Sequence, residues 1–408
     1  MNYIKRTIED RFLQMNDGFE VVLLSGARHV GKTTMLRHLS EGEKRSYATM
    51  DHMMVRHLAK SDPALFFQTY KPPILIDEIQ YAPELFAQIK TLCEESEEKG
   101  LFWLTASQHC YSRNPVCQSL EGKMGALELH SLSRNEIEGI HFGNKLDFSL
   151  PCLLERQRSS PKNDLVQAFE RIWRGGMPQL LGAGAEQRAA YYESYIDSYL
   201  MRDATQLGGI TDLLKFRKFI TASAALVSTQ VNYKVLAEAS DISQPTAKEW
   251  LGLLEKLGVV YLLKAYDDTR FKRLSKTPKL YFYDTGLCAY LSRWLSAEAL
   301  RNGAAGRSFF ECYIVSELIK TFAAEGMQVE ISHFRDTKAK EISLLVDRNQ
   351  VIHPLEIKLS ANPDVKEIRK FSILDTIHKE RGAGGILCMC QEVVPVNAKD
   401  CYIPCNLI

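Results

Sequence analysis

A short run near the N-terminus has the residue types and spacing that bind the phosphates of a nucleotide. It fits the pattern G-x-x-x-x-G-K-[ST], in which glycines allow backbone N–H groups to turn toward the α- and β-phosphates. Lys32 can reach the β- and γ-phosphates, and the hydroxyl of Thr33 can ligate Mg²⁺. The residues expected to bind nucleotide are Gly26, Ala27, Arg28, His29, Val30, Gly31, Lys32, Thr33 and Thr34.

Two carboxylates end a second apolar run that begins at Ile74. Asp77 is expected to hold Mg²⁺, and Glu78 to polarise the water that attacks the γ-phosphate. Together with the loop, this pair predicts that the chain binds ATP with Mg²⁺ and hydrolyses it. The alternative is a coincidental glycine turn beside an ordinary acidic strand end. The context weighs against it, because a strand-like run precedes the loop and a helix-like run follows it.

Polar residues at the end of a third apolar run are further catalytic candidates. Ser107 and Gln108 would lie beside the γ-phosphate and could sense it, because ligands bind at the carboxyl ends of parallel strands. A hydroxyl residue that merely caps a strand end is an equally frequent arrangement, and the sequence does not choose between the two roles.

The elements that must position these residues alternate along residues 1–145. Short apolar runs and helical stretches in this order predict an α/β domain, with helices on both faces of a parallel sheet. The expected strands are Val21–Ser25, Ile74–Asp77, Phe102–Thr105 and Ala126–Leu129, and a charged helix is expected over Pro83–Glu98.

The composition is that of a globular protein, with 408 residues, of which 45% are hydrophobic and 25% charged. This length suggests about two to four domains. The net charge of +1 means that any nucleic-acid surface must be local. The ten cysteines lack a CxxC pair or metal-ligand spacing, so free thiols in a reducing cytoplasm are expected. Since no signal or membrane-spanning segment is apparent, the expected location is cytoplasmic, with no membrane partner.

Residues 146–298 are predicted to be mainly helical. Residues 146–210 are interpreted as a helical lid, with a long helix over Gln187–Gln206. Residues 211–298 have the order helix, helix, turn, helix and hairpin, which is typical of a winged helix. Its expected elements are Phe216–Leu226, Tyr233–Ala239, Gln244–Leu257, Val259–Lys264 and Lys279–Tyr283.

A winged helix that binds DNA places its last helix in the major groove. The candidate contacts at the start of that helix are Ser243, Gln244, Thr246 and Lys248. Basic residues of the hairpin are Lys264, Arg270, Lys272, Arg273, Lys276 and Lys279. The alternative is a protein-binding module whose charges form a solvated face, so DNA and a protein partner both stay open.

Residues 299–408 are long enough for a small α/β domain of their own. A helix is expected over Gly306–Phe322, and a later one over Val365–Ile373. The expected strands are Val329–Phe334, Glu341–Val346, Pro354–Ile357 and Gly385–Cys388.

The chain resembles a family of prokaryotic AAA-like P-loop ATPases that have a C-terminal domain of unknown function. The resemblance covers almost the whole chain and implies an ATP-binding core with the residue roles given above, but no substrate. Besides the phosphate-binding loop, it rests on L-I-D-E-I-Q at 75–80, L-T-A-S-Q at 104–108, S-L-E-G-K at 119–123, G-G-M-P at 175–178, Y-L-M-R-D at 199–203 and K-T-P-K-L-Y-F-Y-D-T-G-L at 276–287.

The resemblance also implies a finger residue. The family commonly has Leu-Ala-Gly-Arg where this chain has L-E-G-K at 120–123. If that arginine stabilises transferred charge between the subunits of a homo-oligomer, Lys123 keeps the charge but loses the bidentate contact, and a slower ATPase follows. Arg113 and Arg134 are the other candidates.

The last domain is similar to PD-(D/E)xK nucleases, which bring two acidic residues and a Glu-x-Lys to one metal ion. Glu311 and the pair Glu356 and Lys358 fit that pattern. Ser343 occupies the position expected for the aspartate, and a hydroxyl brings no charge to Mg²⁺. Asp347 lies too far along the same strand to replace it. Nuclease activity is therefore not expected.

Two functions are compatible with these features. The first is an ATP hydrolase whose nucleotide state moves the winged-helix and nuclease-like regions on DNA. The second is a nucleotide-gated switch or scaffold that recruits a protein and turns over slowly. Asp77 and Glu78 favour hydrolysis, whereas Lys123 and Ser343 favour the switch.

Overall fold

The computed structural model describes residues 3–107, 117, 120–266, 277–335, 340–376 and 379–408. The chain forms two compact units. The first contains residues 1–132 with the short segments Glu255–Gly258 and Ala323–Gly326, and the second contains the rest. Several candidate residues lie outside the described residues, namely Gln108, Arg113, Arg270, Lys272, Arg273 and Lys276.

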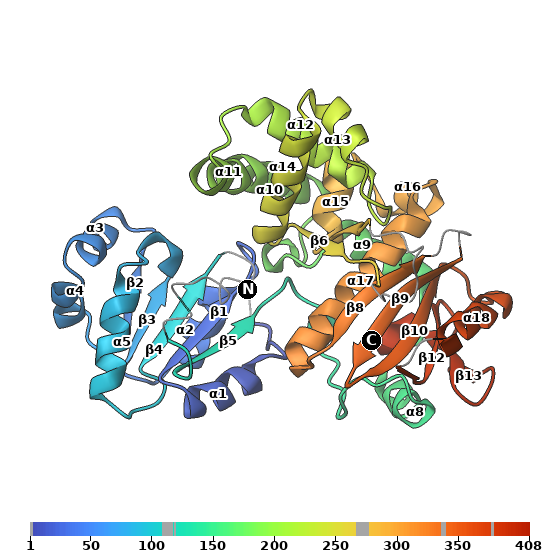
Figure 1. Cartoon of the computed structure of the whole chain (residues 1–408), viewed down its shortest axis with the longest axis horizontal. Helices are drawn as coiled ribbons and strands as arrows, with labels where there is room; N and C mark the ends of the chain where they lie inside the picture. Colours follow the sequence, from blue (N-terminus) through green and yellow to red (C-terminus); the bar gives the residue numbers. More distant parts are fainter. Residues whose placement is uncertain (1–2, 108–116, 118–119, 267–276, 336–339, 377–378) are drawn as a thin grey trace. The chain divides into compact units, whose positions relative to one another are not determined.

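The first unit is built on a parallel five-stranded sheet with the order β2-β3-β4-β1-β5 (Figure 1). Its strands are β1 (Val21–Ser25), β2 (Ser46–Thr49), β3 (Ile74–Asp77), β4 (Phe102–Ala106) and β5 (Met124–Glu128). In this order β1 and β3 both neighbour β4, so their carboxyl ends lie at one edge of the sheet. The phosphate-binding loop follows β1, and Asp77 ends β3.

Alternation along the strands divides the apolar side chains between the two faces of this sheet. Val21 and Leu23 pack with α3 (Met53–Ser61), α4 (Pro63–Thr69) and α5 (Leu85–Glu95). Val22 and Leu24 face the other way and pack with α1 (Glu9–Gly18) and α2 (Lys32–Leu39). The predicted α/β fold with helices on both faces is confirmed.

The predicted strands of this sheet are found, with two differences. β5 begins at Met124, two residues before the expected start. β2 was not predicted, because its sequence Ser-Tyr-Ala-Thr is short and mostly polar. It forms an edge strand that pairs only with β3, where a continuous apolar pattern is not needed.

The second unit begins with a helical region. The predicted long helix is present as α10 (Ala185–Tyr195), a π-helical turn over Ile196–Leu200, and α11 (Met201–Gly208). The other helices of the unit outside the C-terminal sheet are α7 (Arg134–Glu138), α8 (Leu150–Ser159), α9 (Leu165–Arg174), α12 (Leu213–Ala225), α13 (Tyr233–Ser240), α14 (Gln244–Lys256), α15 (Thr285–Leu291) and α16 (Ala297–Asn302).

Two strings that carry the family resemblance meet at a buried aspartate. The carboxylate of Asp284 accepts hydrogen bonds from the backbone N–H of Gly176 and from the hydroxyl of Tyr192, each at 2.8 Å. It also caps α15 through the N–H of Leu287 at 2.8 Å. The strings at 175–178 and 276–287 therefore form one structural junction in this unit.

The predicted order of three helices and a hairpin is present in residues 213–282. α12, α13 and α14 are followed by β6 (Val260–Leu263) and β7 (Lys279–Phe282), which pair antiparallel. Lys279 was predicted to be a basic residue on the hairpin surface, and this is wrong. It is 5% exposed, and its ammonium lies 3.2 Å from Glu311 and 2.5 Å from Glu341, so these ion pairs hold it inside.

The C-terminal part of the unit has a mixed sheet with the order β13-β14-β12-β10-β9-β8, and β11 pairs with β10 (Figure 1). The long helix α17 (Gly306–Glu325) precedes the sheet in the chain. The short helix α18 (Lys366–Arg369) comes between the strands β10 and β11. The strands are β8 (Glu330–Arg335), β9 (Glu341–Arg348), β10 (Val351–Lys358), β11 (Glu380–Arg381), β12 (Gly384–Cys388), β13 (Val394–Pro395) and β14 (Asp400–Pro404).

Candidate nucleotide-binding site

The loop between β1 and α2 has the backbone geometry of an anion-binding turn. Gly26 and Gly31 have φ values of 144° and 101°, which residues with a side chain rarely adopt. A Cβ at Gly26 would lie 2.1 Å from the carbonyl oxygen of Leu129, so only glycine fits there. Gly31 is the N-cap of α2, which places the positive end of that helix at the loop.

Lys32 is buried at the start of α2 and contacts both the loop and β4. Its ammonium donates hydrogen bonds to the carbonyls of Gly26 at 3.0 Å and Ala27 at 2.9 Å. A third contact joins it to the hydroxyl of Ser107 at 3.1 Å. These three contacts hold the charge at the mouth of the loop, where it can meet a phosphate.

Asp77 and Thr33 form an oxygen-rich pair beside Lys32. The Thr33 hydroxyl donates to Oδ1 of Asp77 at 2.7 Å. Thr105 donates to the same oxygen at 2.6 Å, and Tyr47 donates to Oδ2 at 3.2 Å. A hydroxyl and a carboxylate are hard oxygen ligands, so Thr33 and Asp77 suit a Mg²⁺ ion that also contacts phosphate.

Both oxygens of the Glu78 carboxylate are engaged. Oε1 accepts a hydrogen bond from Ser107 at 2.5 Å, and Oε2 accepts one from the Gln80 amide at 2.5 Å. The guanidinium of Arg28 lies 3.9 Å from Oε2. Burial favours the protonated acid, but the charges of Lys32 and Arg28 and the two hydrogen bonds outweigh it and lower the pKa of Glu78. Glu78 is thus held as a carboxylate at neutral pH.

The backbone at Glu78 is also fixed. Its φ of 60° lies in the left-handed region, which is uncommon for a residue with a side chain and marks strain at many functional sites. Its N–H donates to the hydroxyl of Thr105 at 2.9 Å, and that hydroxyl in turn contacts Asp77. One threonine of β4 therefore positions both acidic residues.

The N-terminal segment supports the loop from outside the motif. The guanidinium of Arg6, which is 5% exposed, donates to the carbonyls of Val30 and His130, each at 2.8 Å. Glu9 accepts from the Arg6 backbone at 2.5 Å. The loop is therefore tied to both the N-terminal segment and the chain that follows β5.

The other predicted nucleotide contacts lie on or near the loop. Val30 is buried in the cluster that contains α2, and Thr34 is exposed on α2. His29 has a φ of 65° within the turn. Arg28 is 7% exposed and points its guanidinium to Glu78 and to the hydroxyl of Tyr81.

Two of the predicted finger residues, Lys123 and Arg134, have partners that the structure shows. Lys123 immediately precedes β5, so it lies at the amino-terminal ends of the parallel strands, whereas the phosphate-binding loop lies at their carboxyl ends. Its ammonium donates to the carbonyl of Cys93 at 2.7 Å. Lys123 is therefore separated from the phosphate-binding loop of its own chain, and its predicted role between subunits stays a prediction. Arg134 is 6% exposed in the second unit, where it binds the carbonyl of Asn406 at 2.6 Å and Glu138 at 2.8 Å. These contacts hold its side chain within the second unit, and its role as a finger stays a prediction.

The nuclease-like residues are all engaged by other side chains. The Ser343 hydroxyl donates to Glu356 at 2.8 Å, and Lys358 lies 3.7 Å from the same carboxylate. Glu311 binds Lys279 and the hydroxyl of Tyr281, at 3.2 and 2.7 Å. In the described ranges, no group of three or more His, Cys, Asp or Glu side chains is arranged to hold a metal.

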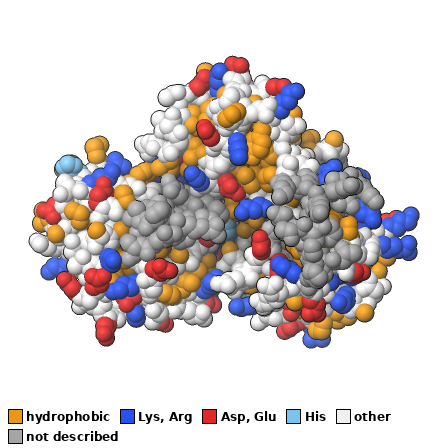
Figure 2. Space-filling model, in the orientation of Figure 1, with side chains coloured by type: hydrophobic (Ala, Val, Ile, Leu, Met, Phe, Trp, Pro, Cys, Tyr) orange, Lys and Arg blue, Asp and Glu red, His pale blue; other side chains and the backbone are white. Residues whose placement is uncertain are grey.

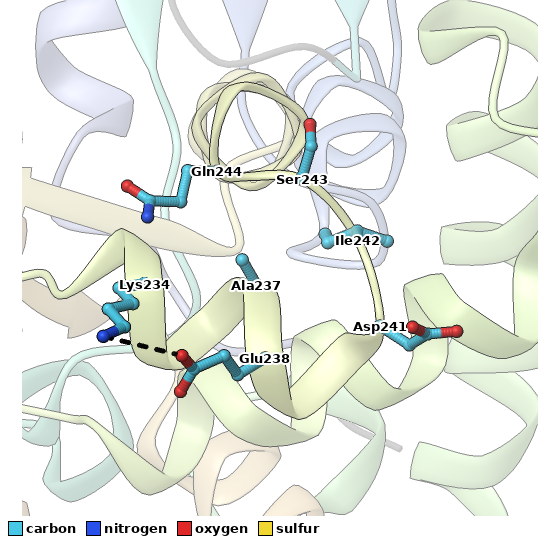
Figure 3. Close-up of a pocket in the computed structure, with 7 residues that line it drawn as sticks. All are labelled: Lys234, Ala237, Glu238, Asp241, Ile242, Ser243 and Gln244. Carbon is cyan, nitrogen blue, oxygen red and sulfur yellow. Dashed lines mark ion pairs between the residues drawn. The ribbon is translucent and has the colours of Figure 1, made fainter.

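A hollow lies at the turn between α13 and α14, with a volume of about 510 Å³ (Figure 3). Its lining residues are Lys234, Ala237, Glu238, Asp241, Ile242, Ser243 and Gln244. Ser243 caps α14 by accepting from the N–H of Thr246 at 3.1 Å, while Gln244 and Lys248 are exposed. Glu238 is paired with Lys234 at 3.9 Å, and Asp241 with Lys215 at 2.9 Å.

Charges of both signs are mixed on the face of the chain that Figure 2 shows. On the face shown in Figure 2, Lys and Arg side chains are interspersed with Asp and Glu over most of the described surface. The net charge of the whole chain is +1, so no general attraction to a polyanion is expected. Any contact with nucleic acid would have to come from a small local surface.

Four residues of the nucleotide site were not singled out from the sequence, namely Arg6, Tyr47, Gln80 and Thr105. Gln80 and Thr105 stand within the strings that carry the resemblance, which was the available signal. Arg6 and Tyr47 had none, because their contacts are made across the fold.

Two further observations concern the cysteines and the helices of the described residues. The cysteines of the described ranges are buried, and none of them is joined to another in a disulfide. No described helix is long and apolar enough to cross a membrane.

Comparison with known proteins divides the chain into three matched regions. Residues 18–138 match a family described as an AAA domain. Residues 166–298 and 307–408 match two families described as domains of unknown function (DUF8612 and DUF4143). The P-loop ATPase domain followed by a C-terminal domain of unknown function, implied by the resemblance, is thereby confirmed.

The similarity to several other proteins covers most of the chain. Uncharacterized proteins of Mycobacterium tuberculosis and Mycobacterium bovis are each 27% identical over 359 residues, which cover 87% of this chain and 74% of theirs. A Walker-type ATPase of Pyrococcus abyssi is 15% identical, with a TM-score of 0.40, over 71% of this chain and 96% of that one. The Thermotoga maritima RuvB Holliday junction branch migration motor is 13% identical, with a TM-score of 0.31, over 62% and 88%. Both TM-scores are low, so the identification of a P-loop ATPase domain rests on the family match and on the topology of the sheet.

Proposed function

We propose that this protein, whose residues 18–138 are an AAA domain, hydrolyses ATP to ADP and phosphate with Mg²⁺. One observation supports this most directly. Lys32, Asp77 and Glu78 converge on the carboxyl edge of a parallel sheet, and Glu78 is kept ionised there by Lys32 and Arg28. A protein that only binds nucleotide has no need of an ionised carboxylate in this place.

The residues divide the work as follows. Backbone N–H groups from Gly26 to Thr33 and the ammonium of Lys32 bind the phosphates. Thr33 and Asp77 would hold Mg²⁺, and the ion would supply positive charge that stabilises the phosphates. Glu78 accepts a proton from a water molecule while that water forms a bond to the γ-phosphorus. The bond from this phosphorus to the bridging oxygen breaks, and ADP leaves with that oxygen.

Steady-state phosphate release tests the proposal. Wild type should turn over ATP in the presence of Mg²⁺, and Lys32→Ala should lose both nucleotide binding and turnover. Glu78→Gln should keep nucleotide binding and lose turnover, because the amide cannot accept the proton. If wild-type protein binds ATP without turnover, the hydrolase proposal is wrong.

We further propose that the nucleotide state is coupled to residues 211–298 and that these residues contact DNA. The support is the order of α12, α13, α14 and the β6–β7 hairpin, together with exposed Gln244 and Lys248 at the start of α14. Fluorescence anisotropy with a labelled duplex, at two salt concentrations, tests it. Lys248→Ala should weaken binding and reduce its dependence on salt. The same affinity for DNA in both proteins would remove α14 from the proposal.

The slow switch is retained as the second function, because Lys123 replaces an arginine and Ser343 replaces an aspartate at positions where the resembling families have catalytic residues. In that case ATP would bind tightly, turnover would be slow, and the ATP-bound form would capture a protein partner. Pull-down with Glu78→Gln, compared with Lys32→Ala, separates nucleotide-dependent capture from capture that ignores the nucleotide.

A further inference from the structure

One amide connects the catalytic carboxylate of the proposed hydrolase to the end of a neighbouring strand. The Nε2 of Gln80 donates to Oε2 of Glu78 at 2.5 Å. The Oε1 of Gln80 accepts from the backbone N–H of Ser107 at 3.3 Å. We propose that Gln80 is a positioning residue that fixes the Glu78 carboxylate for its reaction with water. The inference rests on the proposed ATP hydrolysis at the same site.

The residue type matches this task. The amide of Gln presents a donor and an acceptor on one planar group and carries no charge. Gln80 lies in the 3₁₀ turn Ile79–Tyr81, which begins directly after Glu78 and brings the side chain back toward that carboxylate. Asparagine is one methylene shorter, so it could not reach both Glu78 and Ser107 from the same backbone position.

The surroundings explain why the carboxylate needs holding. Arg28 lies 3.9 Å from Oε2, and its positive charge would draw a free carboxylate into a closer ion pair. Such a pair would direct the carboxylate at a cation instead of a water molecule. Since Gln80 occupies Oε2 with a neutral donor, it keeps the carboxylate at a distance from Arg28.

Ser107 holds the other oxygen but cannot do this alone. Its hydroxyl donates to Oε1 of Glu78 and also accepts from Lys32. Any movement of Lys32 toward a phosphate therefore disturbs Ser107. Gln80 contacts the backbone of Ser107 instead, so its hold on Glu78 does not depend on the position of the lysine.

The test compares Gln80→Met with the matched control Gln14→Met, at an exposed position of α1. Methionine keeps the length and removes the donor and acceptor. Single-turnover hydrolysis and the Kd for a fluorescent ATP analogue are measured for each full-length protein. Gln80→Met should lower the rate about 10- to 100-fold and change Kd less than about threefold, since only the orientation of the carboxylate is lost. Gln14→Met should match wild type.

Two further variants distinguish positioning from a structural role. Gln80→Asn should lower the rate of hydrolysis as much as Gln80→Met does, because asparagine cannot make both contacts. When Ser107 is already alanine, Gln80→Met should lower the rate of hydrolysis by a smaller factor than it does in wild type, since the two residues hold one carboxylate. An unchanged rate in Gln80→Met, or a Kd that rises in proportion to the loss of rate, would overturn the inference. If wild type itself binds nucleotide without hydrolysis, the proposed function fails, and the inference fails with it for that separate reason.

Discussion

The hydroxyl of Ser107 lies between Lys32 and Glu78. It accepts a hydrogen bond from the lysine at 3.1 Å and donates one to the carboxylate at 2.5 Å. The residue that is expected to bind phosphate and the residue that is expected to activate water are thus joined through one oxygen atom. A change at the phosphate side would be transmitted to the carboxylate without any movement of the backbone.

The first prediction concerns that link. Ser107→Ala removes both contacts, so it should lower kcat for ATP hydrolysis about 10- to 100-fold while the fold is retained. Ser61→Ala, at an exposed position that ends α3, is the control and should keep full activity. Phosphate release at saturating ATP measures both. A Ser107→Ala protein with wild-type kcat would show that the link has no catalytic role.

The second prediction concerns Mg²⁺. Asp77→Asn keeps the shape of the side chain but removes the charge that faces Thr33. The Mg²⁺ concentration needed for half-maximal turnover should rise about tenfold or more, because an amide oxygen is a weaker ligand for a hard cation. A titration of activity with Mg²⁺ at fixed ATP measures the change. Unaltered Mg²⁺ dependence would remove Asp77 from the metal site.

The third prediction concerns Arg6, which donates to the carbonyls of Val30 and His130. Arg6→Met leaves two buried carbonyls without these donors, so the free energy of unfolding should fall by about 2–4 kcal/mol. Lys5→Met is the control, because the Lys5 side chain is 59% exposed and its pair with Asp10 contributes little. Denaturant unfolding followed by tryptophan fluorescence measures both variants. An equal decrease in the free energy of unfolding in Arg6→Met and Lys5→Met would contradict the role given to Arg6.

The fourth prediction concerns the pH dependence of stability through Glu356. Burial raises the pKa of this carboxyl from 4.5 to about 7, although Lys358 opposes the shift. Between those two pH values the unfolded chain ionises while the folded chain keeps the proton, so stability falls as pH rises. Glu356→Gln should remove this loss and be more stable than wild type by about 2–3 kcal/mol at pH 8.

At pH 4 the advantage of Glu356→Gln should vanish, because the carboxyl is then protonated in both states. Glu392→Gln, at an exposed position of the same domain, serves as the control. Unfolding curves at both pH values give the comparison. An advantage of the same size at both pH values would show that the buried charge is not its cause.

The sequence predicted the parts of the fold that depend on local pattern. β1, β3 and β4 are continuous apolar runs buried on both faces, and such runs are visible without the structure. β2 was missed because an edge strand needs no such run. The burial of Lys279 was also missed, since it depends on Glu311 and Glu341, which lie far away in the sequence.

The candidate site shows the same division. The phosphate-binding loop and the pair Asp77 and Glu78 were predicted because each is a short contiguous motif at a strand end. The hold of Gln80 on Glu78 is invisible in the sequence, because it requires the 3₁₀ turn that folds the amide back. Lys123 precedes β5, so it lies at the amino-terminal ends of the parallel strands, away from the loop that follows β1.

The most direct test of the account is the rate of phosphate release from ATP with Mg²⁺ in wild type and in Glu78→Gln, with nucleotide binding measured on the same preparations. The account predicts that both proteins bind ATP with similar affinity and that only wild type releases phosphate. Equal rates of release in the two proteins would contradict the role of Glu78. Binding without release in wild type would contradict hydrolysis and leave the switch.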